Sequence, residues 1–360
     1  MKLLFTYFIP SGGIETLNRL RYHALRAVGI EAHALYLWNG AGTQNMTGIP
    51  HFVTNNDFEI IHVLQTGGYD AIVVTCDHLM LQRLHGLGYR GTIIYEAQGL
   101  GTTEQAESTL AFASTFIRMY ARGAISPPTS HMMVLFQRYL GDFPRFYVQN
   151  MIDTDQFSHR PSPWLNPSGA PILGWIGRLE NNKNWPLYLR IAAALAKEKP
   201  DLQLWMFEDA TISEPGEREK FHHLVRELDL EARLLVRSNI PHGHMPHYLS
   251  AIGDSGGMLL STSYTEGFGY AVAEAMSCRC PVLSTDSDGV RCFIDHNRTG
   301  KFFLSRSVEE AVREAKELFD NRPLTEQLRL QAQQHIRTRF SLERYAADIV
   351  NVLGALGLRA

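Results

Sequence analysis

The chain has 360 residues, of which 45% are hydrophobic and 20% charged, and its formal net charge is −3. This length exceeds one ordinary domain of about 100–200 residues, so two globular domains are expected and a disordered chain is excluded. The small negative charge, without any Lys/Arg block, argues against nucleic acid as a partner. No run reaches the roughly 18–20 apolar residues of a membrane-spanning helix, and the start of the chain resembles a signal peptide for three residues only. We therefore expect a cytoplasmic protein.

In the first half, short apolar runs alternate with segments of helical spacing. Residues 2–8 predict a strand that the Pro/Gly-containing stretch 10–13 ends, and a helix from Ile14 to Val28 follows. Further strands are expected at three more apolar runs: 31–38, 71–75 and 92–95. Strands separated by helices indicate a parallel sheet that is covered on both faces.

The second half restarts this alternation after 159–169, the densest Pro/Gly/Ser stretch, which reads as a linker. Strands are expected at 171–176, 202–207, 233–236, 258–262 and 281–284, and helices at 186–197, from the cap at Ser307 and from the cap at Ser341. The fold class is thus α/β, with two doubly wound domains. Their ranges are 1–158 and 159–340, and a final helix at about 341–360 is added to the first. A ligand is expected at the carboxyl ends of the strands, in a cleft between the sheets.

The most specific pattern lies at 263–276, where a strand ends in a loop that carries Glu266 and the glycine pair of 267–269. A helix of small residues follows, and its first-turn amides can hold oxygen atoms or an anion. Glu274 comes eight residues after Glu266, so the two carboxylates could line one wall at different depths. The alternative is that Glu266 only complements the helix dipole and that Glu274 is solvated.

Two further loops follow strands in the same way. Arg178 and Lys183 lie between a strand end and a helix start, and a guanidinium and an ammonium beside free amides suit a diphosphate. Gly12 and Gly13 follow the first strand, but they do not form the G-x-G-x-x-G dinucleotide motif. The alternative for Arg178 and Lys183 is a solvated loop with ordinary surface cations, and the alternative for Gly12 and Gly13 is a tight βα loop.

Together these motifs resemble the retaining glycosyltransferases of family 4 (glycosyl transferases group 1), which have the GT-B architecture of two Rossmann-like domains that face a central cleft. The similarity follows the order of the family along almost the whole chain and is strongest in the second half. It rests on the segments 12–15, 149–157, 177–183, 266–276 and 281–282.

The resemblance implies a role for each matched position. Arg178 and Lys183 bind the donor diphosphate, and Glu274 binds the ribose hydroxyls. The donor sugar is held by Glu266 and by the backbone amides of Gly267, Phe268 and Gly269. Gly13, next to Gly12, approaches the diphosphate from the other domain. Glu266, Arg178 and Lys183 are the catalytic candidates, because two cations and a helix terminus can stabilise a leaving diphosphate without a metal.

What the resemblance implies is a retaining, metal-independent hexosyltransferase without a cofactor. Its donor is a UDP-sugar or, next, a GDP-sugar, and its acceptor is an unidentified sugar, lipid-linked or small molecule in glycan, cell-envelope or secondary-metabolite glycosylation. The expected location is cytoplasmic, with peripheral contact at the inner face of the membrane as an option. The apolar stretches 110–120 and 131–140 would provide that contact, although core packing is the commoner cause of such a pattern.

Several positions depart from the family pattern. Gln98 stands where many members have a histidine, so it can contact a sugar hydroxyl but cannot carry a proton. Cys280 and Cys292 replace the usual Gly and Glu, and 208–209 replaces a glycine-rich turn. These departures motivate the alternatives of a non-catalytic sugar-nucleotide-binding scaffold or of an epimerase or hydrolase.

Metal sites are the remaining candidates. The D-x-D patterns at 153–155 and 286–288 are weak signals for a metal, since such short patterns are common by chance. The histidines of 242–247 are also a weak signal, because no carboxylate or Cys accompanies them at metal spacing. The segment 278–280 has one residue between its two thiols, so it is not a C-x-x-C redox motif.

Overall fold

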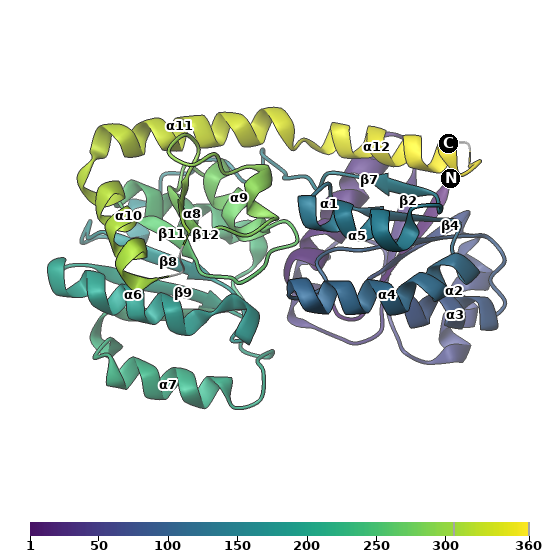
Figure 1. Cartoon of the computed structure of the whole chain (residues 1–360), viewed down its shortest axis with the longest axis horizontal. Coiled ribbons are helices and arrows are strands. Elements are labelled where there is room, and N and C mark those ends of the chain that lie inside the picture. The colour runs from purple at the N-terminus through teal and green to yellow at the C-terminus, as the bar shows by residue number, and fades with distance from the viewer. Residues whose placement is uncertain (305–306, 359–360) are drawn as a thin grey trace. The chain divides into compact units, whose positions relative to one another are not determined.

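The chain divides into two compact units in a computed structural model that describes residues 1–304 and 307–358. Unit 1 comprises Met1–Met151 and Phe340–Ala360, and unit 2 comprises Ile152–Arg339. Each unit contains one sheet with helices on both faces (Figure 1). All strand pairs of both described sheets are parallel, which confirms the expected α/β class.

The sheet of unit 1 has seven strands in the order β3-β2-β1-β4-β5-β6-β7. Their bounds are β1 Lys2–Tyr7, β2 Glu31–Tyr36, β3 His51–Val53, β4 Ala71–Thr75, β5 Thr92–Glu96, β6 Gly123–Ser126 and β7 Arg145–Tyr147. The chain reverses its direction of strand addition between β1 and β4, because β2 and β3 lie on one side of β1 and the later strands on the other. Such a switch leaves space beyond the carboxyl ends of the strands.

Helices cover both faces of this sheet. They are α1 Gly12–Ala27, α2 Asp57–Gly67, α3 His78–Gly86, α4 Thr103–Tyr120, α5 Ser130–Leu140 and α12 Leu342–Ala355, with the short 3-10 helix η1 Ala41–Asn45. Buried side chains of α2 to α5 share one core with the strands, whereas α12 packs against α1. The last two residues of the segment expected as the final helix, 359–360, lie outside the described residues.

The sheet of unit 2 has six strands in the order β10-β9-β8-β11-β12-β13. The strands are β8 Ile172–Ile176, β9 Gln203–Glu208, β10 Leu234–Ser238, β11 Met258–Ser261, β12 Val282–Thr285 and β13 Lys301–Phe303. The helices are α6 Trp185–Glu198, α7 Glu217–Glu227, α8 Met245–Asp254, α9 Tyr270–Ser277, α10 Val308–Asp320 and α11 Arg322–Arg339, with 3-10 helices η2 Pro163–Leu165, η3 Asn181–Lys183, η4 Glu231–Arg233, η5 His242–His244 and η6 Val290–Cys292.

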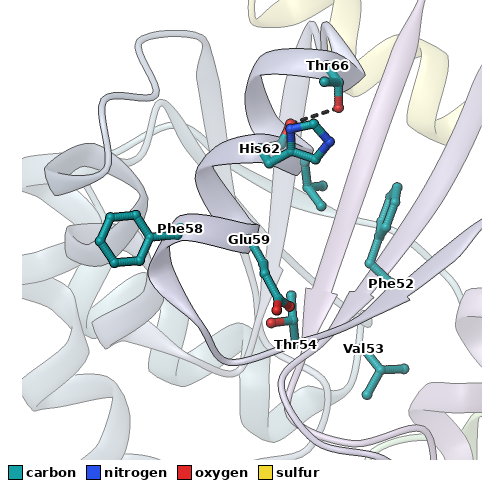
Figure 2. Close-up of a pocket in the computed structure, with 8 residues that line it drawn as sticks. Phe52, Val53, Thr54, Phe58, Glu59, His62 and Thr66 are labelled. Carbon is teal, nitrogen blue, oxygen red and sulfur yellow. Dashed lines mark hydrogen bonds between the residues drawn. The ribbon is translucent and has the colours of Figure 1, made fainter.

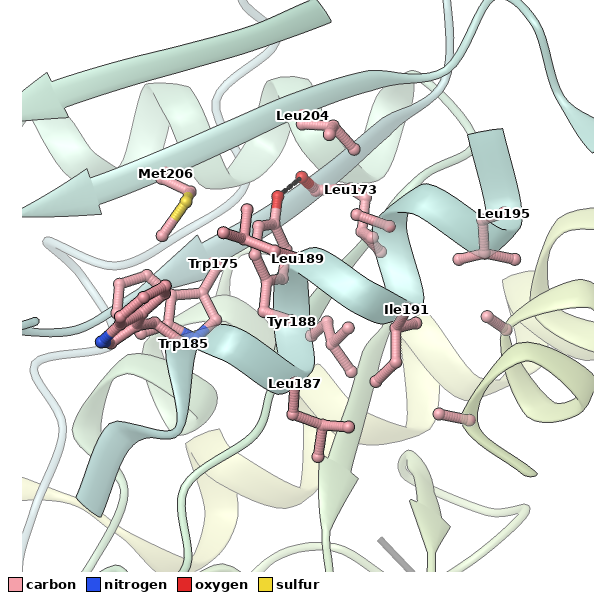
Figure 3. Close-up of a cluster of buried hydrophobic side chains, with 14 of the residues drawn as sticks. Leu173, Trp175, Trp185, Leu187, Tyr188, Leu189, Ile191, Leu195, Leu204 and Met206 are labelled. Atoms are coloured by element: carbon pink, nitrogen blue, oxygen red, sulfur yellow. Dashed lines mark hydrogen bonds between the residues drawn. The ribbon is translucent and has the colours of Figure 1, made fainter. Parts of the chain in front are cut away.

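The larger core of unit 2 lies between the sheet and helices α6, α7 and α10. Figure 3 shows Trp175 and Leu204 of the strands packed against Tyr188 and Ile191 of α6. The Tyr188 hydroxyl, buried in this core, donates a 2.9 Å hydrogen bond to the carbonyl oxygen of Leu173. This close packing holds helix α6 against the strands of the sheet.

The stretch 159–169, expected as a linker, differs from that expectation. It lies within unit 2, where His159 is 2.9 Å from Asp254 and the Ser162 hydroxyl is 2.7 Å from Nδ1 of His247. Its Pro/Gly/Ser composition prevents a long helix or strand, but these side-chain contacts hold the backbone in place.

Candidate functional site

The structure places the predicted site residues at the carboxyl ends of strands in both units. Gly12, Gly13 and Gln98 belong to unit 1, after β1 and β5, whereas the predicted residues from Arg178 to Glu274 belong to unit 2. In unit 2 the loops after β8 and β11 carry Arg178, Lys183 and Glu266, and these two strands are neighbours in the sheet. Adjacent parallel strands bring the loops at their carboxyl ends together.

Lys183 and Glu266, which are 83 positions apart, form an ion pair. The Lys183 ammonium donates to Oε1 of Glu266 at 2.7 Å, and the Ser263 hydroxyl donates to the same oxygen at 2.6 Å. Their side chains are 21% and 14% exposed, so both remain within reach of a ligand. The expected partners of a diphosphate and of a sugar thus lie in direct contact with each other.

Asn182 joins the two loops and was not predicted from the sequence. Its side-chain amide donates to the carbonyl oxygen of Thr265 at 3.0 Å, and its Oδ1 accepts from the Thr265 amide at 3.2 Å and from the Thr265 hydroxyl at 2.9 Å. Its backbone carbonyl oxygen accepts from the amide of Tyr264 at 2.8 Å. Asn182 therefore fixes the position of Lys183 relative to Glu266. An asparagine in a run of polar loop residues gives no signal that would reveal this contact.

Arg178 is more exposed than Lys183, the other predicted cation of the site. Its guanidinium, 37% exposed, lies 3.1 Å from the carboxylate of Glu180, which is 17% exposed. A five-donor guanidinium has N–H groups beyond those that one carboxylate uses. An anionic ligand at Arg178 would nevertheless lie near Glu180, which sequence reasoning did not select.

The loop with the two glycines is held by a buried aromatic ring and a backbone hydrogen bond. Gly269 has φ +91°, a left-handed conformation that favours glycine, and it immediately precedes α9. The Phe268 ring is buried against Phe293, with 5.3 Å between ring centroids. The Gly289 amide donates to the carbonyl oxygen of Glu266 at 3.1 Å. The side chain of Phe268 thus anchors the loop, while the start of α9 lies beside Glu266.

Glu274 lies on α9 with a side chain that is 8% exposed, and its partner is a histidine. Nε2 of His242 is 2.9 Å from Oε1 of Glu274. The alternative of a solvated Glu274 is therefore wrong. His242 was considered only as a weak metal candidate, because 32 residues separate it from Glu274 and only the sheet brings them together.

Gln98 is part of a buried polar network in unit 1. Its Nε2 donates to Glu96 Oε1 and to Asn150 Oδ1, both at 3.1 Å, and its Oε1 accepts from the Asn150 amide at 2.8 Å. Glu96, 2% exposed, also accepts from Arg21 at 2.7 Å and from the Thr75 hydroxyl at 2.7 Å. Since the Glu96 carboxylate accepts only, it fixes which end of the Gln98 amide faces it. Arg21 and Glu96 were not predicted, because Arg21 is one of several arginines in an expected helix and Glu96 only ends an apolar strand.

Gly12 and Gly13 begin α1 directly. Gly12 has φ +63°, and Ser11 precedes it as the cap residue of the helix in extended conformation. The helix therefore starts two residues earlier than expected, and the amide of Gly13 lies in its first turn. First-turn amides have no acceptor within the helix, which is the property that the predicted phosphate contact requires.

The departures from the family pattern also have structural explanations. The Glu208 carboxylate, at the end of β9, accepts from both Nη atoms of Arg218, at 2.9 and 3.0 Å. Cys280 is fully buried, and burial raises its pKa to about 12, so the thiol stays protonated. Burial likewise raises the pKa of Cys292 to about 11. Both thiols are therefore protonated at neutral pH.

A separate hollow of about 460 Å³ lies in unit 1. Figure 2 shows it between β3, which carries Phe52 and Val53, and α2, which carries Glu59, His62 and Thr66. None of the predicted site residues lines it. Within residues 1–304 and 307–358, no group of three or more His, Cys, Asp or Glu is placed to hold a metal ion. Across the same residues, no helix combines the length and apolarity needed to cross a bilayer.

The apolar stretches 110–120 and 131–140 divide between core and surface. Leu110, Ile117 and Phe136 are buried in the core of unit 1, whereas Phe112 and Met119 are 61% and 65% exposed. Core packing therefore explains one face of α4 and α5 and does not explain the other.

Comparison with known proteins gives a family match within the second unit. Residues 159–335 match the family model described as glycosyl transferases group 1, and this range contains Arg178, Lys183, Glu266 and Glu274. The resemblance to glycosyl transferases group 1 is thereby confirmed over this range.

Two curated relatives are similar over part of the chain. The 2-deoxystreptamine N-acetyl-D-glucosaminyltransferase of Niallia circulans is 23% identical over 199 residues, which cover 54% of this chain and 49% of the relative. The D-inositol 3-phosphate glycosyltransferase of Corynebacterium aurimucosum is 26% identical over 172 residues, which cover 47% of this chain and 40% of the relative. The chain thus spans half or less of the length of these relatives.

A solved structure is similar over the whole chain. Anabaena HepE in complex with UDP and glucose superposes with a TM-score of 0.82 at 19% identity, over 99% of this chain and 100% of that chain. The likeness establishes the fold, and the expected GT-B architecture of two Rossmann-like units is confirmed.

Proposed function

We propose, from the group 1 match of residues 159–335 and the geometry within it, that the chain is a glycosyltransferase. It moves a sugar from a nucleoside-diphosphate sugar to an acceptor hydroxyl, retains the anomeric configuration and uses no metal. The observation that carries the proposal is the contact of Lys183 and Glu266 at the ends of β8 and β11. A cation and a carboxylate in direct contact suit a ligand in which a phosphate and a sugar are directly linked.

The residues divide the work according to their charge. Lys183 and Arg178 stabilise the negative charge that builds on the leaving diphosphate, and the first-turn amides of α9 add partial positive charge. Glu266 accepts hydrogen bonds from sugar hydroxyls, and Ser263 holds one of its oxygens. Glu274 accepts from the ribose hydroxyls. In unit 1, Gly13 supplies a backbone amide, and Gln98 offers its amide oxygen as an acceptor.

The donor is a UDP-sugar, with a GDP-sugar as the second choice. The support for UDP is that HepE, which has the same fold, was solved with UDP and glucose. The two curated relatives are named for 2-deoxystreptamine and D-inositol 3-phosphate, which are small polar molecules, and this supports a small-molecule hydroxyl acceptor.

The proposal is tested by transfer from labelled UDP-sugars and GDP-sugars to a cell extract, with release of the nucleotide as a second readout. Lys183→Ala and Glu266→Ala should each lower transfer at least about tenfold to a hundredfold, because each loses a charged hydrogen bond of about 1.5–3 kcal/mol. Lys197→Ala and Glu309→Ala are matched controls, since both side chains are exposed on helices of unit 2. Wild-type rates in either site variant would refute the assignment. Donor consumption without a glycoside product would indicate a hydrolase or epimerase. If no glycoside forms and no nucleotide is released, the chain is a non-catalytic scaffold.

A further inference from the structure

Glu274 and His242 form a buried pair in unit 2, and the proposed reaction assigns a role to Glu274 but none to His242. The two side chains are 8% and 15% exposed, and the Nε2–Oε1 distance is 2.9 Å. Burial of a carboxylate is costly unless a donor compensates for the lost water. His242 provides that donor, and it contacts one of the two carboxylate oxygens.

His242 is itself held in place by the chain around it. It begins the 3-10 helix η5, directly after Pro241. Its ring lies against the buried Phe157 with 4.7 Å between centroids. The carbonyl oxygen of Phe157 accepts a hydrogen bond from the hydroxyl of Ser277, the last residue of α9. The helix that carries Glu274 and the ring that contacts Glu274 are therefore tied to the same residue.

The chemistry of the pair fixes how Glu274 can meet a ligand. An ionised carboxylate only accepts hydrogen bonds and has about four acceptor positions on its two oxygens. Nε2–H of His242 occupies one position on Oε1 and thereby fixes the rotation of the carboxylate plane. The two vicinal hydroxyls of a ribose can both donate to the oxygens of a carboxylate that is held in this way.

We propose that His242 is a positioning residue that orients Glu274 for the ribose diol, so that the site selects ribonucleoside diphosphates over their deoxy forms. This inference rests on the proposed function, because it concerns the same donor site. His242 acts through Glu274 and does not need to touch the nucleotide.

The test is a thermodynamic cycle between the histidine and the ribose hydroxyls. Titration calorimetry first identifies which of UDP, GDP and ADP binds the wild-type chain most tightly. The 2′,3′-dideoxy form of that nucleotide is then measured. His242→Phe keeps a ring against Phe157 but has no donor, His242→Ala leaves room for water if the Phe variant fails to fold, and His242→Gln restores an N–H donor. His244→Ala, an exposed position in the same 3-10 helix, is the matched control.

Loss of the diol should weaken binding to the wild type and to His244→Ala by about tenfold to a hundredfold, as expected for hydrogen bonds to a charged group. In His242→Phe and His242→Ala the same change should cost less than about threefold, and His242→Gln should recover most of the discrimination. If the histidine variants weaken both nucleotides equally, or leave the discrimination at its wild-type value, the inference is wrong while the proposed function stands. If the wild type binds none of the three diphosphates, the proposed function fails together with the inference.

Discussion

Gly289 offers the most direct test of whether the glycine loop must hold Glu266 in its observed place. A Cβ at this position would lie 2.3 Å from the carbonyl oxygen of Glu266 and 2.8 Å from the carbonyl carbon of Gly267. These are backbone atoms, so no side-chain rotation can relieve the overlap. In Gly289→Ala the loop must therefore move by an amount comparable with the overlap, roughly 1 Å, at an expected cost of about 1–3 kcal/mol.

Such a shift separates Glu266 from Lys183, whose contact is 2.7 Å in the structure. A displacement of about 1 Å at a reacting centre can lower the rate about a hundredfold. We therefore expect kcat/KM for sugar transfer to fall by a factor of about ten to a hundred, together with a lower melting temperature. The assay is transfer of label at several donor concentrations beside a thermal melt.

Gly354→Ala is the matched control for the Gly289 variant. It makes the same change inside helix α12, where a Cβ would meet nothing within 4 Å. Alanine favours a helix by up to about 1 kcal/mol over glycine, so this variant should be as stable as the wild type or more stable, with unchanged transfer. Unchanged kcat/KM and unchanged melting in Gly289→Ala would refute the steric reasoning.

Two predictions concern stability. Arg21→Met removes the partner of the Glu96 carboxylate, which is 2% exposed, so the free energy of unfolding measured in urea should fall by about 3–5 kcal/mol. The double variant with Glu96→Gln should lose clearly less, and equal losses would contradict a buried ion pair. Burial, with Arg339 nearby, lowers the pKa of His335 in the folded chain. Protonation then favours the unfolded chain, so the stability contribution of His335 is complete above the ordinary histidine pKa of about 6.5 and falls as the pH drops below it. His335→Gln should flatten this fall in thermal melts between pH 7.5 and 5. An unchanged slope of melting temperature against pH would contradict the assignment.

Much of the fold follows from local sequence patterns. The strand expected at 171–176 is Ile172–Ile176, and the one at 258–262 is Met258–Ser261, because a buried parallel strand is a short continuous apolar run between turn residues. Strand β3, His51–Val53, has three residues and lies at a sheet edge, so it leaves no comparable pattern.

The site was less predictable than the fold. Residue types after strand ends identified Lys183, Glu266 and Glu274, but not the side chains that hold them. Asn182 and His242 contact residues 83 and 32 positions away, and these contacts depend on the order of strands in the sheet, which local patterns do not encode. Side-chain partners across strand ends therefore require the three-dimensional structure.

The ion pair of Lys183 and Glu266 bears on which ligands this site would attract. An ammonium that already has a counter-charge is a weak trap for inorganic phosphate, because phosphate alone would displace the acid and leave its charge without compensation. A ligand that brings hydroxyl groups for the acid along with phosphate oxygens for the ammonium satisfies both partners in one event. Under the proposed function, the ion pair is therefore opened by a ligand in which sugar and phosphate are joined, rather than by either part alone. It re-forms when the diphosphate product leaves.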